Sequence, residues 1–193
     1  VDKTSIDKAA LVRREADHDL GEIGYGCFLT LKHGLFIASA GIDESNSEQG
    51  GYILYPEDPF RSAEQIRDGL MKAWGLAEAG LDLGVLVTDS HTSPLRAGVT
   101  GVALAHAGFR GVRNKIGTPD LFGQPLKMTQ INVADALAAS AVFCMGEADE
   151  CSPLAWIHTP VEFGHDPQTA RKECQIPAAL DLYAPLYGDR LAI

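Results

Sequence analysis

The chain lacks several signals that would assign it to a familiar class of protein. It has no run of about 18 apolar residues, the length that a membrane-spanning helix requires, and Val1-Asp2-Lys3 opens no apolar signal-peptide stretch. Lys and Arg number only 16 against 26 Asp and Glu, for a net charge of −10, and they are not clustered as a nucleic-acid surface requires. We therefore expect a cytoplasmic protein that binds neither membranes nor nucleic acid and that needs a cation to bind a phosphate.

The motifs of several enzyme classes are also absent. There is no G-x-S-x-G of an α/β-hydrolase, no H-E-x-x-H, and no G-x-x-x-x-G-K-[ST], so a nucleotide would bind without a P-loop. The glycines of residues 21–26 lack the third glycine of a dinucleotide fingerprint and predict a turn. The four cysteines form no C-x-x-C pair and have no His at zinc-finger spacing, which favours buried reduced thiols over a disulfide or a zinc site.

What is present is the composition of an ordinary globular protein. The chain has 193 residues, of which 46% are hydrophobic and 22% charged, enough for one sizeable core. We predict one domain over residues 1–193, with a small C-terminal lobe over residues 157–193 as an alternative.

Helical and strand patterns both occur along the chain. Helices are predicted over residues 8–19, over 62–74 from a capping-box pattern at Ser62, and over 132–145 with a terminating Gly146. Strands are predicted over residues 34–40, 52–55 and 83–88 from short apolar runs. The mixture predicts an α/β fold, in the form of an α+β mixed sheet with helices.

Two acidic residues follow predicted strands. Asp43 comes after the strand over residues 34–40, and Asp89 comes after the strand over residues 83–88. Ligands collect at the carboxyl ends of strands in α/β folds, and Mg²⁺ and Mn²⁺ hold nucleotides through one or two carboxylates together with the phosphates. Asp43 and Asp89 are therefore candidate metal ligands, and the alternative for each is a turn or helix-capping residue.

Other polar residues allow two interpretations. Ser45 and Asn46 suit hydrogen bonds to a nucleotide or a local turn. Arg96 suits a phosphate or an ordinary surface position, and His91 suits an acid or base or a surface polar position. Glu147 follows a predicted helix end, where negative charge is unfavourable. It is either a third metal ligand or a member of a solvated acidic cluster.

Five segments, taken in order, resemble the coenzyme F-420-0:gamma-glutamyl ligase family. They are residues 33–46 with Asp43-Glu44-Ser45-Asn46, Leu54-Tyr55-Pro56-Glu57-Asp58-Pro59, Thr88-Asp89-Ser90 with Arg96-Ala97-Gly98, Asp120-Leu121-Phe122-Gly123, and Val133-Ala134-Asp135 with Met145-Gly146-Glu147-Ala148-Asp149. The resemblance covers most of residues 8–156. The family's additional N-terminal segment has no counterpart in these residues, and beyond residue 158 only short echoes remain.

The resemblance implies roles for seven residues. It implies metal ligation by Asp43, Asp89, Ser90 and Glu147, nucleotide binding by Ser45 and Asn46, and catalysis by Asp43, Asp89 and Arg96. Mg²⁺ or Mn²⁺ would be the cofactor and GTP the co-substrate. The family fold, without a P-loop, is expected, as is a homodimer.

The implied reaction is an amide ligation. GTP phosphorylates a small carboxylate acceptor such as coenzyme F-420-0, and the α-amine of L-glutamate attacks the acyl phosphate. The stretch Asp89-Ser90-His91-Thr92-Ser93-Pro94-Leu95-Arg96 loses an aromatic and a basic residue of the family's pattern, and His91 and Leu95 are among its changed residues. This difference leaves open a related amide ligase with another acceptor or with ATP, and a non-catalytic paralogue acting as a binding protein is a third reading.

Overall fold

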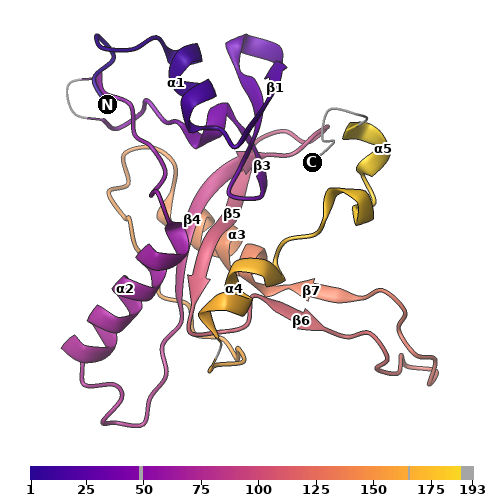
Figure 1. Ribbon diagram of the computed structural model, residues 1–193. Helices are drawn as coiled ribbons and strands as arrows, with labels where there is room; N and C mark the ends of the chain where they lie inside the picture. Colours follow the sequence, from indigo (N-terminus) through magenta and orange to yellow (C-terminus); the bar gives the residue numbers. More distant parts are fainter. Residues whose placement is uncertain (48–49, 165, 188–193) are drawn as a thin grey trace. The chain divides into compact units, whose positions relative to one another are not determined.

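The computed structural model describes residues 1–47, 50–164 and 166–187 as helices and small sheets (Figure 1). The chain forms two compact units, of which unit 1 comprises Val1–Glu57, His91–Val99 and Gln175–Ile193, and unit 2 comprises Asp58–Ser90 and Thr100–Cys174. The mixture of helices with small, largely antiparallel sheets confirms the predicted fold class. The prediction of one domain stays a prediction.

Unit 1 contains a helix and a three-stranded antiparallel meander. The elements are α1 (Lys8–Glu15), β1 (His18–Glu22), η1 (Gly24–Gly26), β2 (Phe28–Lys32), β3 (Leu35–Ala38), η2 (Ser39–Gly41), η4 (Ala178–Leu180) and α5 (Ala184–Tyr187). The turn between β2 and β3 is His33-Gly34, in which both residues have positive φ, 52° and 79°. Two successive positive φ angles match the right-handed twist of a two-residue hairpin.

The core of unit 1 is formed by α1 and by residues that follow β3. Leu11 and Val12 are fully buried against Ile42, with Phe28 and Leu54 packed at the edge. Thr30 of β2 is also fully buried. Its hydroxyl donates to the Ile37 carbonyl at 2.6 Å and accepts from the Ala40 N–H at 2.8 Å. This buried hydroxyl therefore has both partners that it needs.

Unit 2 is built around the paired strands β4 and β5. The elements are α2 (Pro59–Ala73), β4 (Val85–Thr92, whose last two residues belong to unit 1), β5 (Val99–Ala107), β6 (Val112–Asn114), β7 (Gln130–Asn132), α3 (Val133–Met145) and α4 (Pro167–Glu173). Ala63 of α2 packs against Ala105 and Ala107 of β5. On α3, the Asp135 carboxylate accepts from the Ala103 N–H of β5 at 2.9 Å. Small side chains thus let both helices approach the same strand.

Helix α4 is attached to unit 2 by buried and bidentate charge contacts. His106, only 2% exposed, lies 2.7 Å from the Glu173 carboxylate through Nε2. The same Glu173 oxygen accepts from the Gly111 N–H at 2.5 Å. Arg171 donates both of its terminal nitrogens to Asp58, at 3.0 and 2.8 Å. The bidentate pair of Arg171 with Asp58 fixes the orientation of the two side chains as well as their contact.

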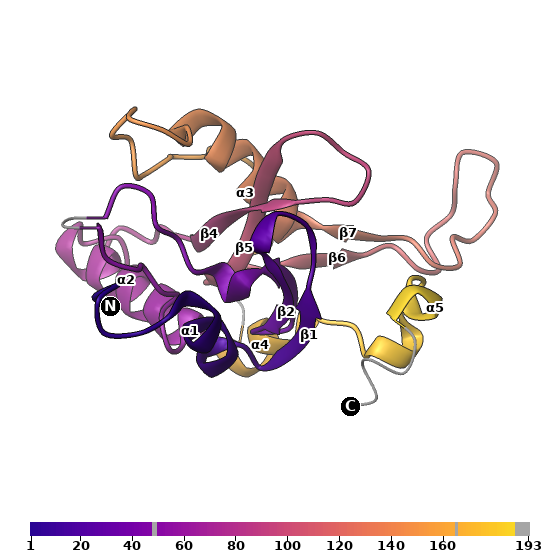
Figure 2. The ribbon, with the colours of Figure 1, turned by 90° about the horizontal axis from the view of Figure 1, so that it is seen from above.

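The loop between β6 and β7 extends away from the rest of unit 2 (Figure 2). The Asp120 carboxylate accepts from the N–H groups of Phe122 and Gln124, both at 2.8 Å. Leu121 and Phe122 are nonetheless 99% and 89% exposed. The loop is therefore an ordered turn that presents two large apolar side chains to solvent.

Several predicted element boundaries are corrected. The helix predicted from Ser62 begins at Pro59, because the Asp58 side chain accepts from the Arg61 N–H and caps it. The helix predicted over residues 8–19 ends at Glu15, and residues 18–22 form β1. The strand predicted over 52–55 is reduced to one bridge between Ile53 and Asp43. The helix over 132–145 is confirmed, with Asn132 as its cap and Gly146 at its end.

The cysteines are unpaired, as predicted, but they are not buried. Cys27 is half-buried, and Cys144, Cys151 and Cys174 are exposed. Burial of its thiol, together with the neighbouring Glu173 carboxylate, still raises the pKa of Cys174 to about 12. The residue as a whole is exposed, but its sulfur is packed against Gly111, where an added Cβ would lie 2.8 Å from it.

Within the described residues, no helix is both long and apolar enough to cross a membrane.

Candidate functional site

The backbone at Asp43 is fixed by contacts on both sides. Ser39, Ala40 and Gly41 all have positive φ and turn the chain after β3. Asp43 then forms a bridge with Ile53, in which each N–H donates to the other residue's carbonyl, at 3.1 and 2.9 Å. The bridge places the Asp43 side chain on an exposed turn that follows a buried residue, Ile42.

The Asp43 carboxylate is also held by its own turn. It accepts from the Ser45 hydroxyl at 2.7 and 2.8 Å, from the Ser45 N–H at 2.9 Å and from the Glu44 N–H at 2.6 Å. Partial burial raises the pKa of Asp43, but the hydrogen bonds from Ser45 and Glu44 lower it by more, so the pKa lies below its ordinary value. The carboxylate is thus ionised at neutral pH, as an oxygen ligand for Mg²⁺ or Mn²⁺ must be.

Two lysines lie beside Asp43 because they hold its neighbour, Glu44. Lys3 pairs with one Glu44 oxygen at 2.8 Å and Lys8 with the other. Hydrogen bonds from Lys3 and Lys8 lower the pKa of Glu44 to about 2. The Glu44 charge is therefore balanced within unit 1 by two lysines, whereas the Asp43 carboxylate is held by hydrogen bonds from Ser45 and Glu44.

The remaining unit 1 candidates differ in their exposure. Asn46 follows in the same turn with a φ of 50° and is exposed, as is Arg96. The Arg96 N–H donates to the Ser93 carbonyl at 3.2 Å, which closes the turn between β4 and β5. His91 is half-buried near the end of β4. Asp43, Ser45 and Asn46 thus share one turn, with the local hydrogen bonding that was the alternative interpretation for Ser45.

Asp89 and Ser90 belong to unit 2, and the predicted position of Asp89 at a strand end is wrong. Strand β4 continues to Thr92, so both residues lie inside it and are half-buried. Side chains of successive residues point to opposite faces of a regular strand. The Asp89 and Ser90 side chains therefore lie on opposite faces of the strand.

The acidic segment after α3 is stabilised locally. Gly146 ends the helix with a φ of 81°, and the Glu150 carboxylate accepts from the Ala148 N–H at 2.8 Å. This backbone hydrogen bond lowers the pKa of Glu150 below its ordinary value. Glu147 is exposed beside it. The Ala148 N–H thus stabilises part of the negative charge that follows α3. A bound metal ion is the other source of stabilisation that the sequence suggests for this segment.

The donors fit a hard cation that is shared with phosphates better than a cage made by protein alone. In neither unit do the described residues gather three His, Cys, Asp or Glu side chains that could hold a metal ion together. Mg²⁺ commonly uses one or two carboxylates with water and phosphate oxygens. Asp43 in unit 1 and Asp89 in unit 2 have the required chemistry.

Residues outside the predicted set also carry charge in unit 2. Arg110 and Arg113 both form ion pairs with Glu162, and the three side chains lie near Val133. The sequence places the two arginines three residues apart, which is a weak signal by itself. Their convergence on Glu162 depends on tertiary structure, so no local pattern could have indicated it.

Comparison with known proteins gives a consistent family assignment. Residues 3–159 match the model of the family F420-0:Gamma-glutamyl ligase. Three similar proteins are each called Coenzyme F420:L-glutamate ligase. The one from Methanopyrus kandleri is 38% identical over 144 residues, 74% of this chain and 55% of the relative. The one from Methanococcus maripaludis strain C6 is 41% identical over 133 residues, 68% and 51%. The one from Methanocaldococcus jannaschii is 37% identical over 166 residues, 84% and 64%.

The matched region includes the turn at Asp43, strand β4 with Asp89, and the segment after α3 with Glu147. The chain spans between about half and two thirds of the length of these relatives. On the extent of the match, the chain belongs to the F420-0:gamma-glutamyl ligase family.

Proposed function

We propose that this chain carries the metal-binding and nucleotide-binding residues of a ligase. The ligase would join L-glutamate to a small carboxylate acceptor, which we expect to be coenzyme F420-0. The observation that carries the proposal is the Asp43 turn, in which an ionised, exposed carboxylate is fixed by four hydrogen bonds inside a segment that matches the family. The names of the similar proteins support the substrates.

Each candidate residue has a distinct role in this proposal. The Asp43 carboxylate of unit 1 and the Asp89 carboxylate of unit 2 would each ligate Mg²⁺ or Mn²⁺, and Glu147 would assist within unit 2. Ser90 was predicted to assist as well, but as the next residue of β4 it lies on the opposite face from Asp89. The ion would neutralise charge on the triphosphate of GTP and polarise the transferred phosphoryl group. Ser45 orients Asp43 through its hydroxyl, in addition to its predicted place in nucleotide binding, and Asn46 offers an exposed amide to the nucleotide.

The reaction proceeds in two balanced steps. The acceptor carboxylate attacks the γ-phosphorus and GDP leaves, giving an acyl phosphate. The α-amine of L-glutamate then attacks the acyl carbon, inorganic phosphate leaves and the amine loses a proton. The exposed guanidinium group of Arg96 would donate hydrogen bonds to the phosphoryl oxygens and balance their negative charge.

Asp43→Asn and Asp89→Asn should each weaken manganese-dependent GTP binding by at least about tenfold, because each removes an anionic metal ligand. Calorimetric titration of GTP and of ATP, with and without Mn²⁺, measures this. Asp68→Asn is the control, because Asp68 is an exposed carboxylate on α2 whose ion pair with Arg67 is loose, at 3.7 Å.

Each outcome of that titration is informative. Binding in the wild type that is lost in both site variants and kept in Asp68→Asn supports the proposal. Tighter binding of ATP than of GTP would favour the related ligase that uses ATP. GTP affinity that does not respond to metal or to either substitution would contradict the metal assignment and favour a non-catalytic binding protein.

We also propose that the protein is a homodimer in which the loop between β6 and β7 contacts the second copy. Leu121 and Phe122 lie on a turn ordered by Asp120, so burying them costs little loss of conformational freedom. Figures 1 and 2 both show this loop extending from its own unit.

Leu121→Ser combined with Phe122→Ser should shift the protein from dimer to monomer at micromolar concentration, because the pair of side chains supplies apolar area to the interface. Analytical ultracentrifugation measures the mass. Ile66→Ser with Leu70→Ser is the control, because these side chains lie on α2, away from the loop. A double loop variant with the mass of the wild-type dimer would refute this interface.

A further inference from the structure

Two arginines in unit 2 share one carboxylate without binding it closely. Arg110 Nε lies 3.6 Å from one oxygen of Glu162, and Arg113 Nε lies 3.6 Å from the other. Both distances exceed the range of an N–H···O hydrogen bond, 2.7–3.2 Å. All three side chains are at least one-third exposed. The Glu162 carboxylate therefore forms long ion pairs with both guanidinium groups, at distances greater than those of a hydrogen bond.

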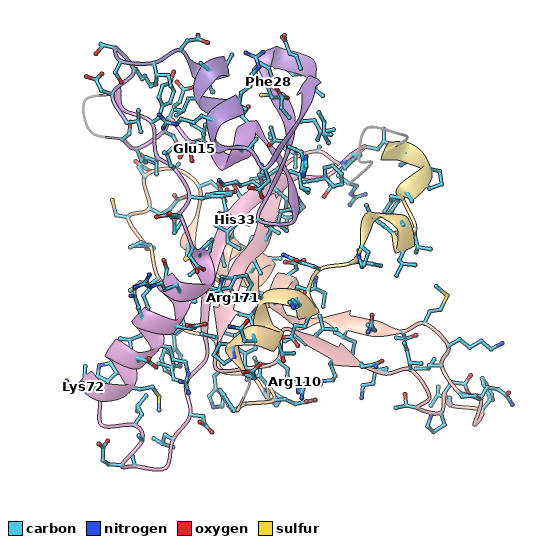
Figure 3. The ribbon with its side chains drawn as sticks, viewed as in Figure 1. Glu15, Phe28, His33, Lys72, Arg110 and Arg171 are labelled. Carbon is cyan, nitrogen blue, oxygen red and sulfur yellow. The ribbon has the colours of Figure 1, made fainter. Side chains whose placement is uncertain are left out.

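The same unit shows what a closed arginine–carboxylate pair looks like. Arg171 binds Asp58 with two hydrogen bonds, at 3.0 and 2.8 Å, and this pair joins α4 to the start of α2. Figure 3 labels Arg171 on α4 and Arg110 below it. The bidentate pair has the geometry of a structural link, whereas the pair of arginines around Glu162 has that of an exchangeable contact.

The backbone around Glu162 stays in place without its side chain. The Arg110 N–H donates to the Glu162 carbonyl at 2.9 Å, and Phe163 forms an antiparallel bridge with Phe109. Arg113 also donates through Nη2 to the Pro160 carbonyl at 3.3 Å. Rotation of the Glu162 side chain would therefore free the guanidinium groups of Arg110 and Arg113 while the segment remains attached.

We propose that Arg110 and Arg113 form a carboxylate-binding site for L-glutamate, which Glu162 occupies when the substrate is absent. This inference rests on the proposed function. In that reaction only the amine of L-glutamate is consumed, so both of its carboxylates need cationic partners throughout. A chain with a net charge of −10 must supply those partners locally. A glutamate side chain already placed between two guanidinium groups is the same chemical group as the ligand.

The test is direct binding of L-glutamate to the full chain without metal or nucleotide, by calorimetry at low ionic strength. Glu162→Gln should tighten binding by about threefold to fivefold, because it removes a competing carboxylate of the strength of an exposed ion pair. Arg113→Gln should weaken binding by about tenfold or more, because it removes a charged donor from the site.

Two charge-matched controls and one competitor define the outcome. Glu78→Gln, an exposed position in unit 2, removes the same negative charge and should leave the affinity unchanged, and Arg14→Gln on α1 serves the same purpose for the arginine variant. Inorganic phosphate should compete at least tenfold more weakly than L-glutamate. Equal competition would show a general anion site and overturn the assignment.

The proposal is also overturned if Glu162→Gln leaves the affinity unchanged, or if neither it nor the wild type binds L-glutamate. Failure of the metal and nucleotide proposal is distinguished by the separate titration of GTP with Mn²⁺ into Asp43→Asn. That experiment requires neither arginine and no glutamate.

Discussion

Gly101→Ala should lower the free energy of unfolding by about 3 kcal/mol, because the new methyl group would overlap a backbone that cannot move aside. A Cβ on Gly101 of β5 would lie 2.2 Å from the Ala138 carbonyl oxygen and 2.8 Å from a Val142 methyl group of α3. Since α3 leads to Glu147, displacing the helix also displaces this candidate metal ligand. Urea denaturation followed by circular dichroism measures the loss.

Gly69→Ala provides the contrasting result for the same substitution. Gly69 lies in α2, and a Cβ there would meet no heavy atom within 4 Å. Alanine has a higher helix propensity than glycine, so this variant should gain about 0.5–1 kcal/mol. If the two variants shift the denaturation midpoint by the same amount in the same direction, the close approach of β5 and α3 is not the cause of the first effect.

Gly41→Ala should be comparably damaging, with a loss of about 2–4 kcal/mol in the free energy of unfolding from two sources. Gly41 has a φ of +68°, which disfavours any residue with a Cβ. A Cβ there would also lie 2.0 Å from the Tyr55 ring. Because the bridge between Asp43 and Ile53 begins two residues later, moving Tyr55 or Gly41 should also displace the Asp43 carboxylate.

Gly50→Ala separates the two sources of that loss. Gly50 has nearly the same φ, +69°, but a Cβ there would meet nothing within 4 Å. It should therefore lose only about 1 kcal/mol, the backbone part of the cost. We expect metal-dependent GTP binding to weaken in Gly41→Ala and to persist in Gly50→Ala, each measured under conditions where the variant is folded. An equal loss of stability in both variants would exclude the contact with Tyr55 as a contributor.

Local signals in the sequence are sufficient to predict a helix boundary when the capping residues of that helix define it. The helix over residues 132–145 is predicted correctly because Asn132 caps it and Gly146 adopts the positive φ that ends it. The start of α2 shows the limit of such signals. Ser62 fits a capping box, but Asp58 followed by Pro59 caps the helix one turn earlier, and two plausible caps so close together cannot be ranked from composition alone.

Strand boundaries depend on partners that are distant in sequence. The sequence predicts Asp89 at a strand end because the apolar run stops before it. In the structure, β4 continues through polar residues to Thr92. Pairing with β5 decides that length, since backbone hydrogen bonds across a hairpin do not require apolar side chains. The opposite error occurs at residues 52–55, where an apolar run forms no strand but isolated backbone contacts, of Ile53 with Asp43 and of Tyr52 with Val1.

The sequence by itself determined the mixed fold class, the third helix, the family and the order of the segments that carry Asp43, Asp89 and Glu147. Each of these depends on residues that are close together along the chain. Only the tertiary structure decided which charges meet. His106 and Glu173 are 67 residues apart, Arg171 and Asp58 are 113 apart, and Arg110 and Arg113 reach Glu162 across the intervening hairpin and helix. Such contacts follow from packing the whole chain, because no local periodicity specifies them.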